Sequence, residues 1–298
     1  MATNLKQADL KIEVEGYISE KKLELTAEKG VEHIKGDIVI QTGDVNFTTF
    51  HIDQYSKKKD ANRNFTNEDN KVFAGLKTIY EEYKSIANSG KEEADKIRTV
   101  GDITPYAYYK DGRYVEGVSY KSMFFNRVNP AEDDEMKAEF AVVGYISGIA
   151  PEVDTEGQPT GRAKVSLWCP TYSGIERLVL IAPEEDGVAE AIMDDCEIGQ
   201  TAEFFGSAVN SKVVTKREIP VKIGKPRVEV KTSYKNEFII TGMTEAYSEE
   251  NAYDPEAIKQ AVQERENRLN EQKAGNKSSS ANGFGRKPAA SGRTLPNF

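Results

Sequence analysis

Basic and aromatic side chains are interleaved along several short stretches of this chain, and the pairing suits single-stranded nucleic acid. Lysine and arginine can follow the phosphates, while flat rings offer surfaces on which bases stack. The candidate binding residues are Tyr55, Lys57, Lys58, Lys59, Tyr106, Tyr108, Lys110, Arg113, Lys121, Arg162, Lys164 and Trp168. The alternative for any single ring is packing in a protein core, so the prediction rests on the cluster.

Trp168 has the clearest pattern among these residues. Residues 162–169 alternate strictly, with Arg162, Lys164 and Trp168 on one face of a predicted strand and apolar residues on the other. Charged side chains are almost never buried without partners. We therefore expect the Trp168 ring to be reachable from solvent and to stack on a base.

No arrangement of residues predicts catalysis. The sequence has no phosphate-binding Gly-Lys loop and no Gly-x-Ser-x-Gly motif. Its two histidines, its two cysteines and the lack of a Cys-x-x-Cys pair argue against zinc. The acidic pairs Asp133-Asp134 and Asp194-Asp195 are more typical of solvated charge than of a magnesium site. We expect a protein that is not an enzyme and uses no cofactor and no metal.

Composition places the chain among globular proteins without excluding nucleic acid as a partner. The net charge is −9, but binding depends on where the cations lie rather than on their sum. Much of the acid is concentrated at 131–135, at 183–186 and after Ser248. The absence of a membrane-length apolar run or an apolar leader, together with few cysteines, predicts a cytoplasmic protein, in the host cytoplasm if it is viral.

A six-residue motif occurs twice and indicates two related halves. Val14-Glu15-Gly16-Tyr17-Ile18-Ser19 returns as Val142-Val143-Gly144-Tyr145-Ile146-Ser147. Both copies lie in apolar runs typical of strands, and a glycine in mid-strand often marks a bulge, a bend or a close backbone approach. A chance repeat is the alternative. The preferred interpretation is two small barrels, each opening with the same bent strand.

The first half is predicted to contain three strands, a helix and two strands. Strands are expected near 10–18, 34–40 and 45–55. A helix is expected to start at Thr66 to Asp69 and to follow an apolar stripe to Ile86, with a second short helix possible before Arg98. A hairpin turning at Asp111-Gly112 completes the half. This is the element order of an OB-fold barrel.

The second half is predicted to repeat that order. Its strands are expected at 140–149, 162–169, 175–182, 202–209 and 237–243, with a helix at 188–194 and a connector that contains Pro220 and Pro226. The predicted fold class is mainly β, with two tandem OB-like five-stranded barrels, each with an inserted helix, and a disordered tail. The expected domains are 1–129 and 138–247, then a polar helix within 248–273 and the tail 274–298.

These features together resemble single-stranded DNA-binding proteins built from OB-folds, in particular the bacteriophage replication or recombination type. The resemblance rests on the doubled strand order, the basic-aromatic strands and the low-complexity tail that ends in Phe298, and it covers residues 10–245 architecturally. It implies a protein that coats single-stranded DNA.

The tail is only partly similar to that of the bacterial members, whose acidic tip ends in Pro-Phe and docks on replication and repair enzymes. Here Asn297 separates Pro296 from Phe298, and the tail carries Arg286, Lys287 and Arg293 instead of acids. The resemblance implies that a partner protein binds Leu295, Pro296 and Phe298, whereas the basic residues leave DNA contact by the tail as an alternative.

Two other functions fit the same sequence features. A viral structural or assembly protein can also combine two β-barrels with a flexible tail. An accessory subunit of a polymerase or recombinase would use the barrels to bind protein.

Overall fold

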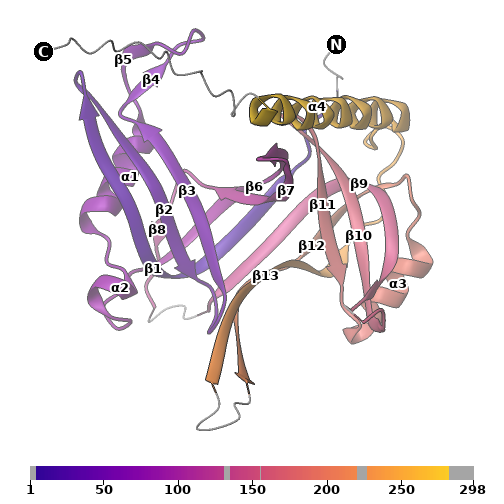
Figure 1. The fold of residues 1–298 in the computed structure, drawn as a ribbon. Helices are drawn as coiled ribbons and strands as arrows, with labels where there is room; N and C mark the ends of the chain where they lie inside the picture. The colour runs from indigo at the N-terminus through magenta and orange to yellow at the C-terminus, as the bar shows by residue number, and fades with distance from the viewer. Residues whose placement is uncertain (1–4, 131–134, 155, 220–226, 282–298) are drawn as a thin grey trace, which may run out of the picture.

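Two barrels share one continuous β-sheet in this protein (Figure 1). The computed structural model describes residues 5–130, 135–154, 156–219 and 227–281. Eleven of the described strands form the shared sheet, in the order β10-β11-β13-β12-β9-β1-β2-β3-β7-β6-β8. The protein is mainly β, as the sequence predicts.

The first barrel is closed by pairing between its first and fourth long strands. Its strands are β1 (Leu10–Glu28), β2 (Val31–Gln41), β3 (Phe47–Tyr55), β6 (Lys96–Lys110) and β7 (Arg113–Lys121), with a short β8 (Asn126–Arg127). A small hairpin, β4 (Lys57–Lys59) and β5 (Phe65–Asp69), and the helices α1 (Lys71–Glu82) and α2 (Ile86–Ser89) lie between β3 and β6. β6 pairs with β1, and β3 meets β7 in parallel at Phe50 and Tyr120.

The second barrel repeats this arrangement. Its strands are β9 (Lys137–Val153), β10 (Pro159–Thr171), β11 (Gly174–Ala182), β12 (Thr201–Ile219) and β13 (Arg227–Met243). The turn η1 (Glu185–Gly187) and helix α3 (Val188–Asp195) lie between β11 and β12. β12 pairs with β9, and β11 meets β13 in parallel at Ile181 and Ile239. The predicted pair of OB-like barrels, each with helix inserted after the third strand, is confirmed.

The repeated motif supplies the bent strands β1 and β9. The ladder between β1 and β2 skips Ser19, and the ladder between β9 and β10 skips Ser147, so each copy carries a bulge at its last residue. A Cβ on Gly16 would lie 2.0 Å from the Gln41 carbonyl oxygen. The glycine is therefore needed for close backbone approach.

The two bent strands also join the barrels to each other. β1 and β9 pair antiparallel from Leu10 opposite Val142 to Glu15 opposite Lys137. Ile12 and Phe140 each lie two residues before their copy of the motif and face each other in this ladder, so the junction is close to twofold symmetric. The division at 129 and 138 into separate domains stays a prediction.

The helical region of the first barrel differs from the sequence prediction at both ends. Residues 65–69 form β5, and α1 starts after Asn70, whose side chain accepts a hydrogen bond from the Val72 N–H at 3.1 Å. The predicted second helix before Arg98 is wrong. Lys96 and Ile97 instead pair with β1 and are buried, because sheet pairing there outweighs local helix propensity.

Two elements, the β12–β13 hairpin and helix α4, are longer than the sequence predicts. The predicted connector after Val209 is wrong, because β12 and β13 stay paired from Asn210 opposite Asn236 to Ile219 opposite Arg227. The resulting hairpin projects away from the barrels (Figure 1). Pro220 and Pro226 lie outside the described residues. Helix α4 (Pro255–Ala281) continues beyond the predicted end at 273 and crosses the top of the molecule above β6, β7 and β11 (Figure 1).

The hydrophobic core runs through both barrels without a break. A series of aromatic contacts leads from Phe125 through Phe50, Tyr120 and Phe238 to Phe140, with ring centroids 5.2–6.5 Å apart. None of the helices in the described part of the chain has the length and apolar character needed to cross a membrane.

Candidate nucleic-acid interface

The β6–β7 hairpin carries five of the predicted binding residues on one face. Its turn, Asp111-Gly112, has positive φ at both residues, as a tight hairpin requires. Paired residues share a face, and the ladder pairs Asp102 with Lys121, Tyr106 with Gly117, Tyr108 with Val115 and Lys110 with Arg113. The residues of this open face are Tyr106, Tyr108, Lys110, Arg113 and Lys121.

The tyrosines of the open face form a small stacking platform. The rings of Tyr106 and Tyr108 are 5.8 Å apart with an interplanar angle of 28°, and Tyr108 is 38% exposed. Tyr106 lies over Gly117, where an added Cβ would come within 2.8 Å of the Tyr106 hydroxyl. The missing side chain of Gly117 thus lets the ring lie flat on the strand.

The cations of the open face differ from Lys57, Lys58, Arg162 and Lys164 in having no ion-pair partner among the described residues. Lys110, Arg113 and Lys121 form no ion pair within the described residues. Lys57 and Lys58 in β4 lie 2.6 Å from Asp69 and 2.8 Å from Glu68. A phosphate can therefore bind the open face without displacing a carboxylate.

The open face leads at Lys121 into a cleft of about 820 Å³ on the first barrel. Tyr55, at the end of β3, stacks on His33 at 4.0 Å, and the Lys59 ammonium lies 3.9 Å from the Tyr55 ring centroid. Phe124, 63% exposed, lines the same cleft. Cations and flat rings thus continue from the hairpin into the cleft.

A second cleft, of about 830 Å³, continues from the same point toward the other barrel. Lys11 and Lys121 line both clefts, and Tyr172 in the β10–β11 turn stands almost fully exposed at the far side. Lys11 is paired with Asp102 at 2.6 Å. The binding residues predicted from the sequence do not include Phe124 or Lys11, although Phe124 belongs to the basic-aromatic stretch after Tyr106.

The predicted cations of the second barrel are neutralised by acids. Arg162 lies 3.0 Å from Glu152 and 2.8 Å from Glu237, and Lys164 lies 3.3 Å from Glu152. Phosphate binding here would compete with existing ion pairs. The DNA-binding role of Arg162 and Lys164 stays a prediction.

Trp168 lies on the predicted strand face, where its ring is only partly open to solvent. The residues between Arg162 and Cys169 alternate between buried and more accessible positions, as expected. However, the ring is only partly accessible, packs on a cluster with Ile175 and Tyr253, and lies 5.4 Å from the Arg265 guanidinium. The expectation of a ring reachable from solvent is met only in part, because Tyr253 and α4 pack against this face. Base stacking by Trp168 stays a prediction.

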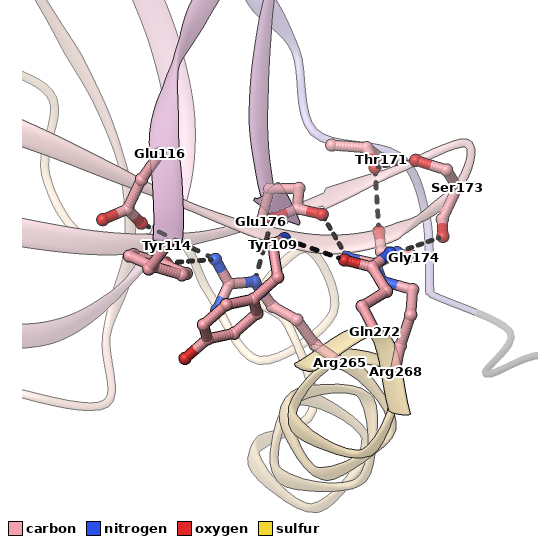
Figure 2. A network of polar contacts seen from close by, with 10 residues as sticks. All are labelled: Tyr109, Tyr114, Glu116, Thr171, Ser173, Gly174, Glu176, Arg265, Arg268 and Gln272. Carbon is pink, nitrogen blue, oxygen red and sulfur yellow. Dashed lines mark hydrogen bonds and ion pairs between the residues drawn. The ribbon is translucent and has the colours of Figure 1, made fainter. Parts of the chain in front are cut away.

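Helix α4 also contacts the opposite face of the β6–β7 hairpin. Figure 2 shows Tyr109, Tyr114 and Glu116 of the hairpin beside Arg265 and Gln272 of α4. The Tyr109 N–H donates to Gln272 Oε1 at 3.1 Å. One face of the hairpin is therefore packed against α4, while the face with Tyr106 and Tyr108 stays open.

The side chains that the hairpin and the first cleft bring together are mainly cations and aromatic rings. Among the residues that the structure describes, no three His, Cys, Asp or Glu side chains come together as metal ligands. Burial raises the pKa of the Cys169 thiol to about 12, which makes it a poor nucleophile. The predicted tail residues Leu295, Pro296 and Phe298 lie outside the described residues.

Comparison with known proteins gives a family and two structural likenesses. No curated protein matches the sequence. The wild-type single-stranded DNA-binding protein from Thermus aquaticus is 10% identical, with a TM-score of 0.46 over 84% of this chain and 98% of that chain. A deletion mutant of that protein gives 10% identity and a TM-score of 0.44 over 85% and 100%. The family model that matches this sequence, over residues 10–275, is that of YorF, and the chain therefore belongs to the YorF family.

Proposed function

We propose that this protein binds and coats single-stranded DNA and does not catalyse a reaction. The observation that carries the proposal is the open face of the β6–β7 hairpin. Three cations that form no ion pair with any described residue flank two stacked tyrosines, and the face leads into a cleft lined by Tyr55, Lys59 and Phe124. This is the combination of charged groove and stacking surface that single strands require.

Stacking favours a single strand over a duplex as the ligand. In a duplex the base faces are already stacked inside the helix, so exposed rings such as Tyr108 and Phe124 gain little. A single strand can present each base to a ring, and its phosphates can follow Lys110, Arg113 and Lys121. The preference for single strands thus comes from the rings, and the salt dependence comes from the cations.

The test measures binding of the full chain to labelled oligo(dT) and to a duplex of equal length at several salt concentrations. We expect tighter binding to oligo(dT) that weakens steeply with salt. The triple variant Lys110→Gln, Arg113→Gln, Lys121→Gln should bind weakly and reduce the salt slope by ~2, since each phosphate contact on a single strand contributes about 0.7.

The control changes exposed cations that lie outside the β6–β7 hairpin and outside both clefts. Lys71 at the start of α1 and Lys259 on α4 are exposed, so Lys71→Gln with Lys259→Gln should leave both affinity and slope unchanged. Equal affinity of the wild-type chain for duplex and single strand, or no binding at low salt, would disprove the proposed function.

We extend the proposal to a role in replication or recombination, of the bacteriophage type and in the cytoplasm. Its support is the sequence resemblance described above. The partner is then single-stranded DNA, with replication or recombination proteins bound through Leu295, Pro296 and Phe298 as a further prediction. Removing residues 282–298 and measuring both DNA affinity and capture of such proteins distinguishes tail docking from DNA contact by Arg286, Lys287 and Arg293.

A further inference from the structure

We propose that Arg265 of α4 is a positioning residue for this interface. It holds the β6–β7 hairpin of the first barrel against the second barrel. The open face of the hairpin thereby stays aligned with the cleft that is lined by Tyr55, Lys59 and Phe124. The inference rests on the proposed function, because the alignment matters for a DNA strand that lies along both the open face and this cleft.

The contacts of Arg265 join three separate parts of the molecule (Figure 2). Its Nε donates to Glu176 of β11 at 2.8 Å, and a terminal nitrogen donates to the Tyr114 hydroxyl of β7 at 3.4 Å. The same guanidinium lies 3.6 Å from the Glu116 carboxylate of β7. One side chain of α4 thus bonds to both barrels.

Burial makes these contacts strong enough to determine position. Arg265 is 7% exposed and Glu176 is 4% exposed, and Arg268 donates a second hydrogen bond to Glu176. Buried charges that lose a partner are expensive, so the arrangement tolerates little displacement. The bonds to Glu176 and Tyr114 raise the pKa of Arg265 against the opposing effect of its desolvation, so the guanidinium stays charged.

Helix α4 makes few apolar contacts, so the polar contacts of Arg265 and Arg268 determine how the helix is oriented on the barrels. Only Ile258, Ala261 and Leu269 are buried apolar residues in the part of α4 whose side chains are described. Further along the helix, Gln272 accepts from the Tyr109 N–H, and the Lys273 ammonium lies 5.6 Å from the Tyr109 ring centroid. These contacts extend the support along the hairpin.

The location of the network explains why it positions the hairpin without occupying its binding face. Tyr109, Tyr114 and Glu116 point toward α4, whereas Tyr106, Tyr108 and Lys110 belong to the opposite face. A two-stranded hairpin alone is only marginally ordered in water. Holding it in place before the ligand arrives removes an ordering cost from binding.

The test replaces the guanidinium with an apolar side chain of similar length, Arg265→Met, in the full chain. We expect about 2- to 10-fold weaker binding to oligo(dT), with an unchanged salt slope because Arg265 contacts no phosphate. We also expect a changed Trp168 emission and greater quenching by acrylamide in the absence of DNA, because Trp168 is the single tryptophan and lies beside Arg265.

A second variant separates positioning from loss of stability. Arg265→Met alone leaves Glu176 with fewer partners, whereas Arg265→Met with Glu176→Gln removes the buried charge and should recover thermal stability. If Arg265 positions the hairpin, the double variant still binds DNA weakly. Recovery of affinity together with stability would overturn the inference, and Lys259→Met on the exposed side of α4 is the matched control.

The outcomes distinguish this inference from the proposed function. If the wild-type chain binds no oligo(dT) but Arg265→Met still changes the Trp168 emission, the proposed function fails, and with it the positioning role. If the wild-type chain binds and Arg265→Met binds equally well, the positioning role fails and the proposed function stands.

Discussion

At the scale of single residues, what separates a binding cation from a structural one is its partner. Lys121 forms no ion pair among the described residues, while Arg162 lies between Glu152 and Glu237. An ion pair such as those of Arg162 must be broken before a phosphate can replace the carboxylate. The same residue type thus has different availability at different places in the fold.

Tyr108 offers a direct measurement of stacking. We expect Tyr108→Ala to weaken oligo(dT) binding by about 1–3 kcal/mol with little change in melting temperature, because the ring is exposed and lies on the open face. The matched control is Tyr80→Ala on α1, which is also 38% exposed but lies outside both clefts. Equal losses in the two variants would show that Tyr108 does not stack on DNA.

Tyr120 should make stability fall at alkaline pH. Burial raises the pKa of its phenol from 10 to about 12, so the unfolded chain releases the proton at lower pH than the folded chain. The contribution of Tyr120 to stability is therefore complete below pH 10 and is lost between pH 10 and about 12, by up to about 1.4 kcal/mol per pH unit. Cys169, with a pKa also raised to about 12 by burial, contributes in the same direction.

Urea unfolding at pH 8 to 11.5 tests this expectation. Tyr120→Phe keeps the ring and removes the ionisable hydroxyl, so its stability should decline less steeply than that of the wild type. The hydroxyl also meets Asn210 at 3.4 Å, so a small loss at neutral pH is expected. An identical alkaline decline in both proteins would assign the effect to other groups.

At the scale of elements, the first strand of each barrel is built around a glycine that lets another chain segment approach closely. Gly16 lies against the Gln41 carbonyl of β2, and Gly144 lies against the Leu167 side chain of β10. The bulge that follows each glycine bends the strand so that it pairs on both sides of the closure. In each barrel, the repeated sequence motif thus provides the close approach and the bend that a small closed barrel needs.

Gly16→Ala should disrupt that closure. The added Cβ would lie 2.0 Å from a carbonyl oxygen, so backbone must move, and we expect a loss of about 1–3 kcal/mol or more in unfolding free energy. Gly148→Ala in β9 is the matched control, since no heavy atom lies within 4 Å of its added Cβ. Comparable stability of the two variants in urea would contradict this account of the motif.

At the scale of the whole molecule, three connections make the two barrels depend on each other. The β1–β9 ladder links their sheets, the aromatic series from Phe125 to Phe140 links their cores, and α4 bonds to both. Tyr120 shows the continuity directly, because it belongs to the first barrel and contacts Phe238 and Asn210 of the second. A surface that crosses both barrels is thereby held in one shape.

We therefore expect the chain to unfold in one cooperative transition despite its two barrels. Calorimetry, far-UV circular dichroism and Trp168 emission, which reports on the second barrel, should give the same midpoint. Two resolved transitions, with Trp168 following only one of them, would mean that the barrels are independent domains.

The sequence by itself determined the features that depend on neighbouring residues. Local spacing predicts the Asp111-Gly112 turn, the alternation in residues 162–169 and the repeated bent strands. It does so because the side chains of a strand repeat their direction every two residues. The doubled order of strands and helix followed from these patterns, and with it the OB-like class.

Only the tertiary structure decided which residues remain available for binding. Periodicity assigned Trp168 to the correct face, but α4, almost a hundred residues later, covers that face. Likewise Glu237 neutralises Arg162 from a distant strand, while Lys121 forms no ion pair in the part of the chain that the structure describes. Local spacing fixes the direction of a side chain relative to its own strand. What it meets there depends on long-range packing, which no local pattern records.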